Sequence, residues 1–320
     1  MSPSAISSLL FPARLSPSPV VPLSAPDHFS GWLAAEVHHL QHQPSMSTTW
    51  VLQALDVAVS MQKKAIESIA TDPTQGAIDR SWVEHYLDDV VELLDACNIL
   101  REEMEAMVQY TQAIAKGLHC IEGGSKPTKS ALARAQLALT ACLKTERRRC
   151  NKLEKCTSRL KKVGERKKRT HGELGLSKSE FHEVLSASKA MGVLVCGMLS
   201  TLLSFKRRGV VGVTQSARAE SWASSLYELE KVVVVKGRKG GGPVLDELRS
   251  TVEMAREVRG LIKRSGDEVR KWELRERVEG LGRKSGQLEQ GIRKFEGRVN
   301  ELYRHLISIR VALLGSLTMA

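Results

Sequence analysis

The stretch "SWVEHYLDDVVELLDACNILREEMEAMVQ", residues 81–109, decides the fold class of this chain. Its apolar side chains recur at spacings that alternate between three and four residues, which is the period of one face of an α-helix. The positions are Val83, Tyr86, Val90, Leu93, Cys97, Leu100, Met104 and Met107. Leu87, Val91 and Leu94 widen this face, so we expect more than one neighbouring helix to pack against it.

The same period continues over most of the 320 residues. It predicts further helices from about residue 47 to 70, from 130 to 169, from 177 to 205 and over 288–313. Only 4% of residues are aromatic and 42% are hydrophobic, a composition typical of long helices. Helices joined by brief turns must pack side by side, so we predict an all-α fold, an elongated antiparallel bundle of long helices. Val232 to Val235 are β-branched but have no visible strand partner, and we interpret them as a helix end or loop.

Two regions interrupt the pattern. Residues 1–45 begin with a Pro- and Ser-rich stretch, which predicts a flexible lead that is either a transit segment or a tail. The stretch "GRKGGGP" predicts a linker near residues 236–243. We therefore predict a single helical domain over residues 46–320. Its last seam, from Leu288 to Leu313, either satisfies itself within the chain or pairs with a second copy in a homo-oligomer.

The positive charge of the chain is concentrated in one segment. Residues 144–169 hold thirteen Lys and Arg against three Glu, so 13 − 3 = +10 of the net +12 lies there. Such a segment is either a solvated helix face or an anion-binding surface, of which acidic lipid headgroups are the best match. Nucleic acid is disfavoured because no aromatic residue is present to stack on bases. The candidate anion-binding residues are Lys144, Arg147, Arg148, Arg149, Lys152, Lys155, Arg159, Lys161, Lys162, Arg166, Lys167, Lys168 and Arg169.

The apolar run from Ala190 to Phe205 raises the question of a membrane span. As a helix its sixteen residues measure about 24 Å, against roughly 30 Å for a hydrocarbon core. A stripe of small residues at every fourth position lets another backbone approach closely. The stripe consists of Gly192, Cys196, Ser200 and Ser204. We favour the packed centre of the bundle and keep a membrane span or re-entrant hairpin as the alternative.

Catalytic and metal-binding patterns have little support in the sequence. The acidic pairs Asp88 with Asp89 and Glu102 with Glu103 are expected on outer faces of helices. His38 and His42 stand one helical turn apart, but nothing completes a zinc shell. The six cysteines contain no C-x-x-C pair, which favours free thiols in a reducing compartment. We predict no catalytic residue, no metal and no cofactor.

Residues 81–98, "SWVEHYLDDVVELLDACN", resemble the signature W-V-x-x-Y-L-x-x-x-V-x-L-L-D-x-C-N of the BYPASS family of plant proteins. Weaker similarity covers "FPARLSP", "ASKAMGVLVCGMLSTLLS", "ESWASSLYELEKVV" and "LYRHLISIRVALLGSL". The dense basic segment departs from the family pattern. The matching signature positions are Trp82, Tyr86, Leu87, Leu93, Leu94, Asp95, Cys97 and Asn98.

The resemblance implies a non-enzymatic regulator of plant development that restrains a root-derived mobile signal. Together with the helical seams and the basic segment, it predicts a protein that acts through helical interaction surfaces and docks on anionic membranes. The alternatives are an integral membrane protein anchored by residues 190–205 and an enzyme of small-signal metabolism. The expected location is cytoplasmic or membrane-associated inside the cell, with the plastid as a further option.

Overall fold

The computed structural model describes residues 28–42, 46–71, 80–122, 128–148, 150–170, 180–205, 221–239, 244–264 and 271–319. Helices and short connections make up these ranges, and no strand occurs among them, which confirms the predicted all-α bundle. The predicted helix over 130–169 corresponds to two described helical ranges, Lys129–Arg148 and Cys150–Thr170. The helices are α1 (His28–Gln41), α2 (Thr48–Thr71), α3 (Arg80–Glu122), α4 (Lys129–Arg148), α5 (Cys150–Thr170), α6 (Glu180–Leu202), α7 (Ser221–Lys239), α8 (Asp246–Arg264) and α9 (Lys271–Met319).

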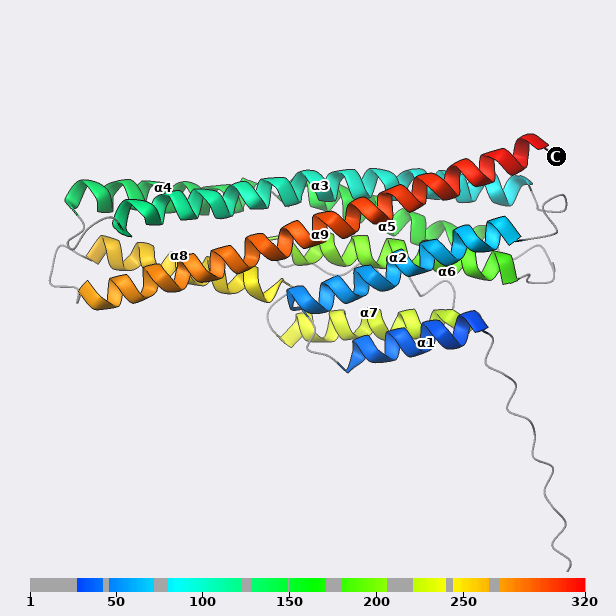
Figure 1. Cartoon of the computed structure of the whole chain (residues 1–320), viewed down its shortest axis with the longest axis horizontal. Coiled ribbons are helices and arrows are strands. Elements are labelled where there is room, and N and C mark those ends of the chain that lie inside the picture. Colours follow the sequence, from blue (N-terminus) through cyan, green and yellow to red (C-terminus); the bar gives the residue numbers. More distant parts are fainter. Residues whose placement is uncertain are drawn as a thin grey trace, which may run out of the picture.

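The two longest helices, α3 and α9, run antiparallel along the bundle and set its elongated shape (Figure 1). With 43 and 49 residues they are about 64 and 73 Å long at 1.5 Å per residue. At one end α4 and α8 pack against them. At the other end α2, α5 and α6 complete the bundle, and α1 and α7 form an additional layer beside α2 and α6.

The C-terminal seam is filled within the chain. Its apolar side chains are all buried, because α9 packs against α2, α3 and α8. Of the two alternatives for this seam, the structure therefore shows the one in which its apolar side chains are buried within the chain. The buried residues of the seam are Leu288, Ile292, Phe295, Val299, Leu302, Leu306, Ile309 and Leu313.

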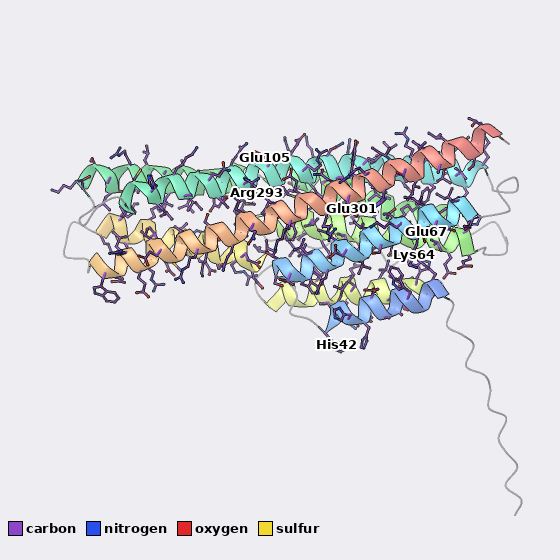
Figure 2. All side chains as sticks on the ribbon, in the orientation of Figure 1. His42, Lys64, Glu67, Glu105, Arg293 and Glu301 are labelled. Carbon is purple, nitrogen blue, oxygen red and sulfur yellow. The ribbon has the colours of Figure 1, made fainter. Side chains whose placement is uncertain are left out.

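Helix α1 lies inside the region predicted as a flexible lead, so that boundary is corrected. Leu33, Val37 and Leu40 are buried where α1 packs against α7 and α2. The ammonium of Lys64 on α2 (Figure 2) lies 4.7 Å from the ring centroid of Trp32 on α1. Residues 1–27 lie outside the described part of the chain. The start of the predicted linker is helical, because α7 continues to Lys239 and includes the four valines from 232 to 235.

Candidate functional site

Helix α6 lies at the centre of one half of the bundle, in contact with α2, α3, α5 and α7. Among the described residues it is the one helix whose length and apolarity would suit a membrane span, and 94% of its most apolar window is buried inside the protein. Gly192, Cys196, Ser200 and Ser204 are all buried. In this structure α6 is covered on all sides by other helices, as a core helix is.

The small residues of α6 are the points where its neighbours come close. A Cβ atom added to Gly192 would lie 3.5 Å from a methyl group of Leu93 on α3. Two turns further, the Ser200 hydroxyl lies 2.8 Å from the carbonyl oxygen of Cys196 and 3.2 Å from the sulfur of Cys156 on α5. The stripe therefore serves close packing against α3 and α5.

The signature residues of α3 fall into two groups, those buried in the core and those that make polar contacts. Tyr86, Leu87, Leu93, Leu94 and Cys97 are buried in the core of the bundle. Asp95, in contrast, accepts a hydrogen bond from the guanidinium of Arg159 on α5, with 2.8 Å between Nη1 and Oδ2. Asn98 is half-buried and accepts a long contact of 3.5 Å from Arg101. The signature residues of α3 thus supply both core contacts and the ion pair with Arg159 of α5.

An aromatic cluster lies where the start of α3 packs against the start of α6. The rings of Trp82 and Tyr86 stack with 5.4 Å between centroids, and His182 meets Trp82 edge-on at 4.5 Å. Phe181 is buried beside them, 6.4 Å from Trp82. Burial raises the pKa of the Tyr86 hydroxyl, so this phenol stays neutral throughout the physiological pH range.

An ion pair is buried directly beside this cluster, and sequence reasoning missed it. The ammonium of Lys189 on α6 lies 2.7 Å from Oδ2 of Asp89 on α3, with side-chain exposures of 13% and 7%. The expectation that Asp89 faces outward is wrong, and so is that for Glu103, which is 9% exposed. Asp89 stands three residues after Tyr86 and four before Leu93, so the spacing itself placed it on the apolar face. A buried pair of this kind favours one alignment of the two helices, because displacing either charge removes the close partner of the other.

The basic segment is held against α3 by part of its own charge. Lys152 lies 2.8 Å from Glu102, and Arg159 binds Asp95 at 2.8 Å and lies 3.9 Å from Glu92. Toward the core, α5 buries a short apolar row: Leu153, Cys156, Leu160 and Val163. Apolar contacts and ion pairs together attach α5 to the bundle with a defined face toward solvent.

The outward face of α5 carries lysines. Lys155, Lys161 and Lys162 are exposed, and the spacing of Lys155 and Lys162 puts both on the side opposite the buried row. We call these three residues the α5 lysine face. The side chains of the other eight predicted anion-binding residues lie outside the described part of the structure: Lys144, Arg147, Arg148, Arg149, Arg166, Lys167, Lys168 and Arg169.

Three free cysteines are buried where α3, α5 and α6 meet. Burial raises the pKa of Cys156 to about 12. The hydrogen bond with Cys97, together with burial, raises the pKa of Cys196 well above its usual value. Only a thiolate attacks alkylating reagents or disulfides, so a thiol that stays protonated is inert. These residues act as small apolar side chains in the core.

We therefore expect selective labelling of cysteines in the native protein. Iodoacetamide at pH 8 should modify Cys120, which is half-buried, and leave Cys97, Cys156 and Cys196 unmodified, because they are buried. Peptide mapping by mass spectrometry measures the modified fraction at each residue. Labelling in urea is the control and should reach all four. Rapid modification of Cys196 in the folded protein would contradict this packing.

His38 on α1 and His42, directly after its end, are exposed and lie side by side, with 3.0 Å between their Nε2 atoms. Within the described ranges no cluster of three or more His, Cys, Asp or Glu side chains is arranged to hold a metal ion. The candidate sites in the described part of the chain are the packed interface of α3, α5 and α6 and the basic surface of α5.

Comparison with models of known protein families shows the family of this chain. The model of the family described as Protein BPS1 matches residues 59–315 of the 320-residue chain. The chain belongs to the BPS1 family. This membership agrees with the BYPASS resemblance of the signature on α3, and it supports a role as a plant regulator of the BYPASS type. Searches of curated proteins and of solved structures found no match.

The part that matches the BPS1 family contains the whole candidate site. It begins inside α2 and includes α3, α5 and α6, so the buried ion pair, the small-residue stripe and the α5 lysine face all fall within it. Helix α1 lies before the matched residues.

Proposed function

We propose that this BPS1-family chain is a non-enzymatic regulator of plant development that acts through helical protein-interaction surfaces and docks on anionic membranes. Its developmental role would be the one implied by the family, the restraint of a root-derived mobile signal. The observation that carries the docking step is the α5 lysine face. Its lysines point away from the core on a helix that ion pairs attach to α3.

The expected contribution of the α5 lysine face to membrane affinity follows from the number of its lysines. Each Lys or Arg held close to an anionic membrane contributes about 1 kcal/mol. The α5 lysine face therefore contributes about 3 kcal/mol, which corresponds to about 100-fold in affinity. The remaining basic residues of the segment 144–169 lie on the same part of the chain and would add to this attraction.

Peripheral docking fits the burial of α6 better than anchoring by this helix does. For α6 to cross a bilayer it would have to leave its contacts with α2, α3 and α5 and expose the Asp89 and Lys189 pair to hydrocarbon. Extraction of membranes with alkaline carbonate distinguishes the two modes, because a docked protein is released and an anchored one is retained.

The docking step is tested by a triple substitution, Lys155→Gln, Lys161→Gln and Lys162→Gln. We expect binding to vesicles that contain acidic lipids to fall about 100-fold in a sedimentation assay. Lys152 and Arg159 are left in place, so the attachment of α5 to α3 is preserved.

The matched control replaces three exposed lysines elsewhere, Lys116, Lys263 and Lys294, by glutamine. Both variants have the same net charge, so a general loss of positive charge would weaken both equally. Selective weakening by the α5 variant supports the proposal. Equal binding by the two variants would refute docking through α5.

A further inference from the structure

Two imidazole rings converge at the end of α1, away from the α5 lysine face. His38 and His42 are four residues apart, so their side chains lie one above the other on the same side of the helix. Their ring centroids are 4.3 Å apart but their Nε2 atoms only 3.0 Å apart, so the rings turn these nitrogens toward each other. Both residues are exposed, and Figure 2 shows His42 at the outer edge of the layer that α1 and α7 form. An ion in solution therefore has access to both nitrogens.

The separation of the two nitrogens suits a shared metal ion. In the structure the two Nε2 atoms are at hydrogen-bond distance, and a metal ion would take the place of the proton between them. At a typical metal–nitrogen distance of about 2.1 Å, their separation of 3.0 Å corresponds to an angle of about 90° at the metal. Neighbouring ligands in square-planar and octahedral sites have this angle. Two ligands of a tetrahedral zinc ion would be wider apart, at about 3.4 Å.

The surroundings of the pair leave room for such an ion. The χ2 torsion of histidine is broad, so a small rotation of either exposed ring directs both lone pairs at one point outside α1. Within the described ranges no third His, Cys, Asp or Glu side chain joins the two imidazoles as a ligand. Water would fill the remaining positions of the ion. Two protein ligands therefore make an open, exchangeable site, unlike the closed four-ligand shell of a structural zinc ion.

We propose that His38 and His42 chelate a divalent transition metal ion of the Cu²⁺ or Ni²⁺ type through their Nε2 atoms. Imidazole is a preferred ligand of both ions, and the affinity of a nitrogen site increases from Ni²⁺ to Cu²⁺ and decreases again at Zn²⁺. The bound ion would link the last turn of α1 to the residue that follows it. The site precedes the residues 59–315 that match the BPS1 family, so it is independent of the docking proposed for α5.

The test is isothermal titration calorimetry of the full chain, free of any polyhistidine tag, with nickel chloride. Ni²⁺ is the probe because Cu²⁺ oxidises free thiols, which this chain contains. His38→Gln and His42→Gln should each lower the Ni²⁺ affinity about tenfold or more, because the second imidazole binds intramolecularly once the first is attached. Both positions are exposed, and circular dichroism verifies that the variants stay folded.

His39→Gln is the matched control. This residue is also exposed on α1, but it lies about 100° around the helix from His38, so its replacement should leave the affinity unchanged. An equal loss in this variant would overturn the proposal.

The double variant of His38 and His42 distinguishes a chelate from two separate sites. It should bind Ni²⁺ no more weakly than either single variant, because one imidazole alone cannot chelate. Losses that add up in the double variant would overturn the chelate, and so would a double variant that binds as tightly as the original chain. Tighter binding of Zn²⁺ than of Ni²⁺ would contradict the proposed geometry.

Discussion

Lys189→Met is expected to lower the free energy of unfolding by about 3–5 kcal/mol, because it leaves a carboxylate buried without its ammonium partner. Asp89 is 5% exposed and lies on α3 where it meets α6, so its carboxylate has little access to solvent. Methionine preserves most of the length and apolar contact of the lysine chain, so the loss reports on charge more than on packing. Urea denaturation followed by circular dichroism measures the change.

Two further variants show whether the ion pair itself is responsible. The double variant Asp89→Leu with Lys189→Met should recover most of the lost stability, because apolar residues of similar volume replace buried pairs at little cost. Lys63→Met is the exposed control: its pair with Glu301 is 51% and 27% exposed, so we expect a change of about 0–1 kcal/mol. A loss for Lys189→Met as small as that of Lys63→Met would contradict the buried assignment.

Trp50→Ala is expected to cost about 3–5 kcal/mol, the range for removal of a large buried aromatic side chain. Trp50 is fully buried near the start of α2, and its Nε1 donates a hydrogen bond of 2.9 Å to the carbonyl oxygen of Leu40 at the end of α1. The residue therefore attaches α1 to the bundle as well as filling the core. Thermal or urea unfolding measures the stability, and limited proteolysis should show faster cleavage between α1 and α2.

Trp50→Phe separates the two roles of this residue. Phenylalanine keeps an aromatic ring in the core but cannot donate to the Leu40 carbonyl, so we expect a smaller loss of about 1–3 kcal/mol. If both substitutions destabilised the protein equally, the hydrogen bond and not the volume would dominate at this position. Unchanged proteolysis in both variants would show that α1 is held by its contacts with α7 alone.

Much of the fold could be predicted because helical periodicity is local. The spacing of Val83, Val90 and Leu100 defines one face of a helix regardless of what packs against it, and all three are buried. The helix at His28–Gln41 was missed. Helix α1 does carry the helical period, at Phe29, Leu33, Val37 and Leu40, but it is only 14 residues long, and its main packing partner α7 is distant in sequence.

The candidate site could be predicted only in part. The basic character of α5 follows from composition. Composition does not show which of its basic side chains pair with α3 and which face solvent. Lys152 and Arg159 bind carboxylates of α3, whereas Lys155 and Lys162 face solvent, and this depends on which side of α5 meets α3. The mutual pairing of Asp89 and Lys189, one hundred residues apart, likewise requires the packing of two helices.

The amino-acid sequence by itself determined that this chain is helical, that its charge is concentrated in residues 144–169, and that α3 carries the BYPASS signature. These properties depend on residue types at short separations, which the backbone converts directly into faces of a helix. Only the tertiary structure decided that the apolar run of α6 is covered by other helices, that the C-terminal seam is filled within the chain, and that Asp89 pairs with Lys189. Each of these depends on which helices are neighbours, and many long-range contacts acting together determine that arrangement.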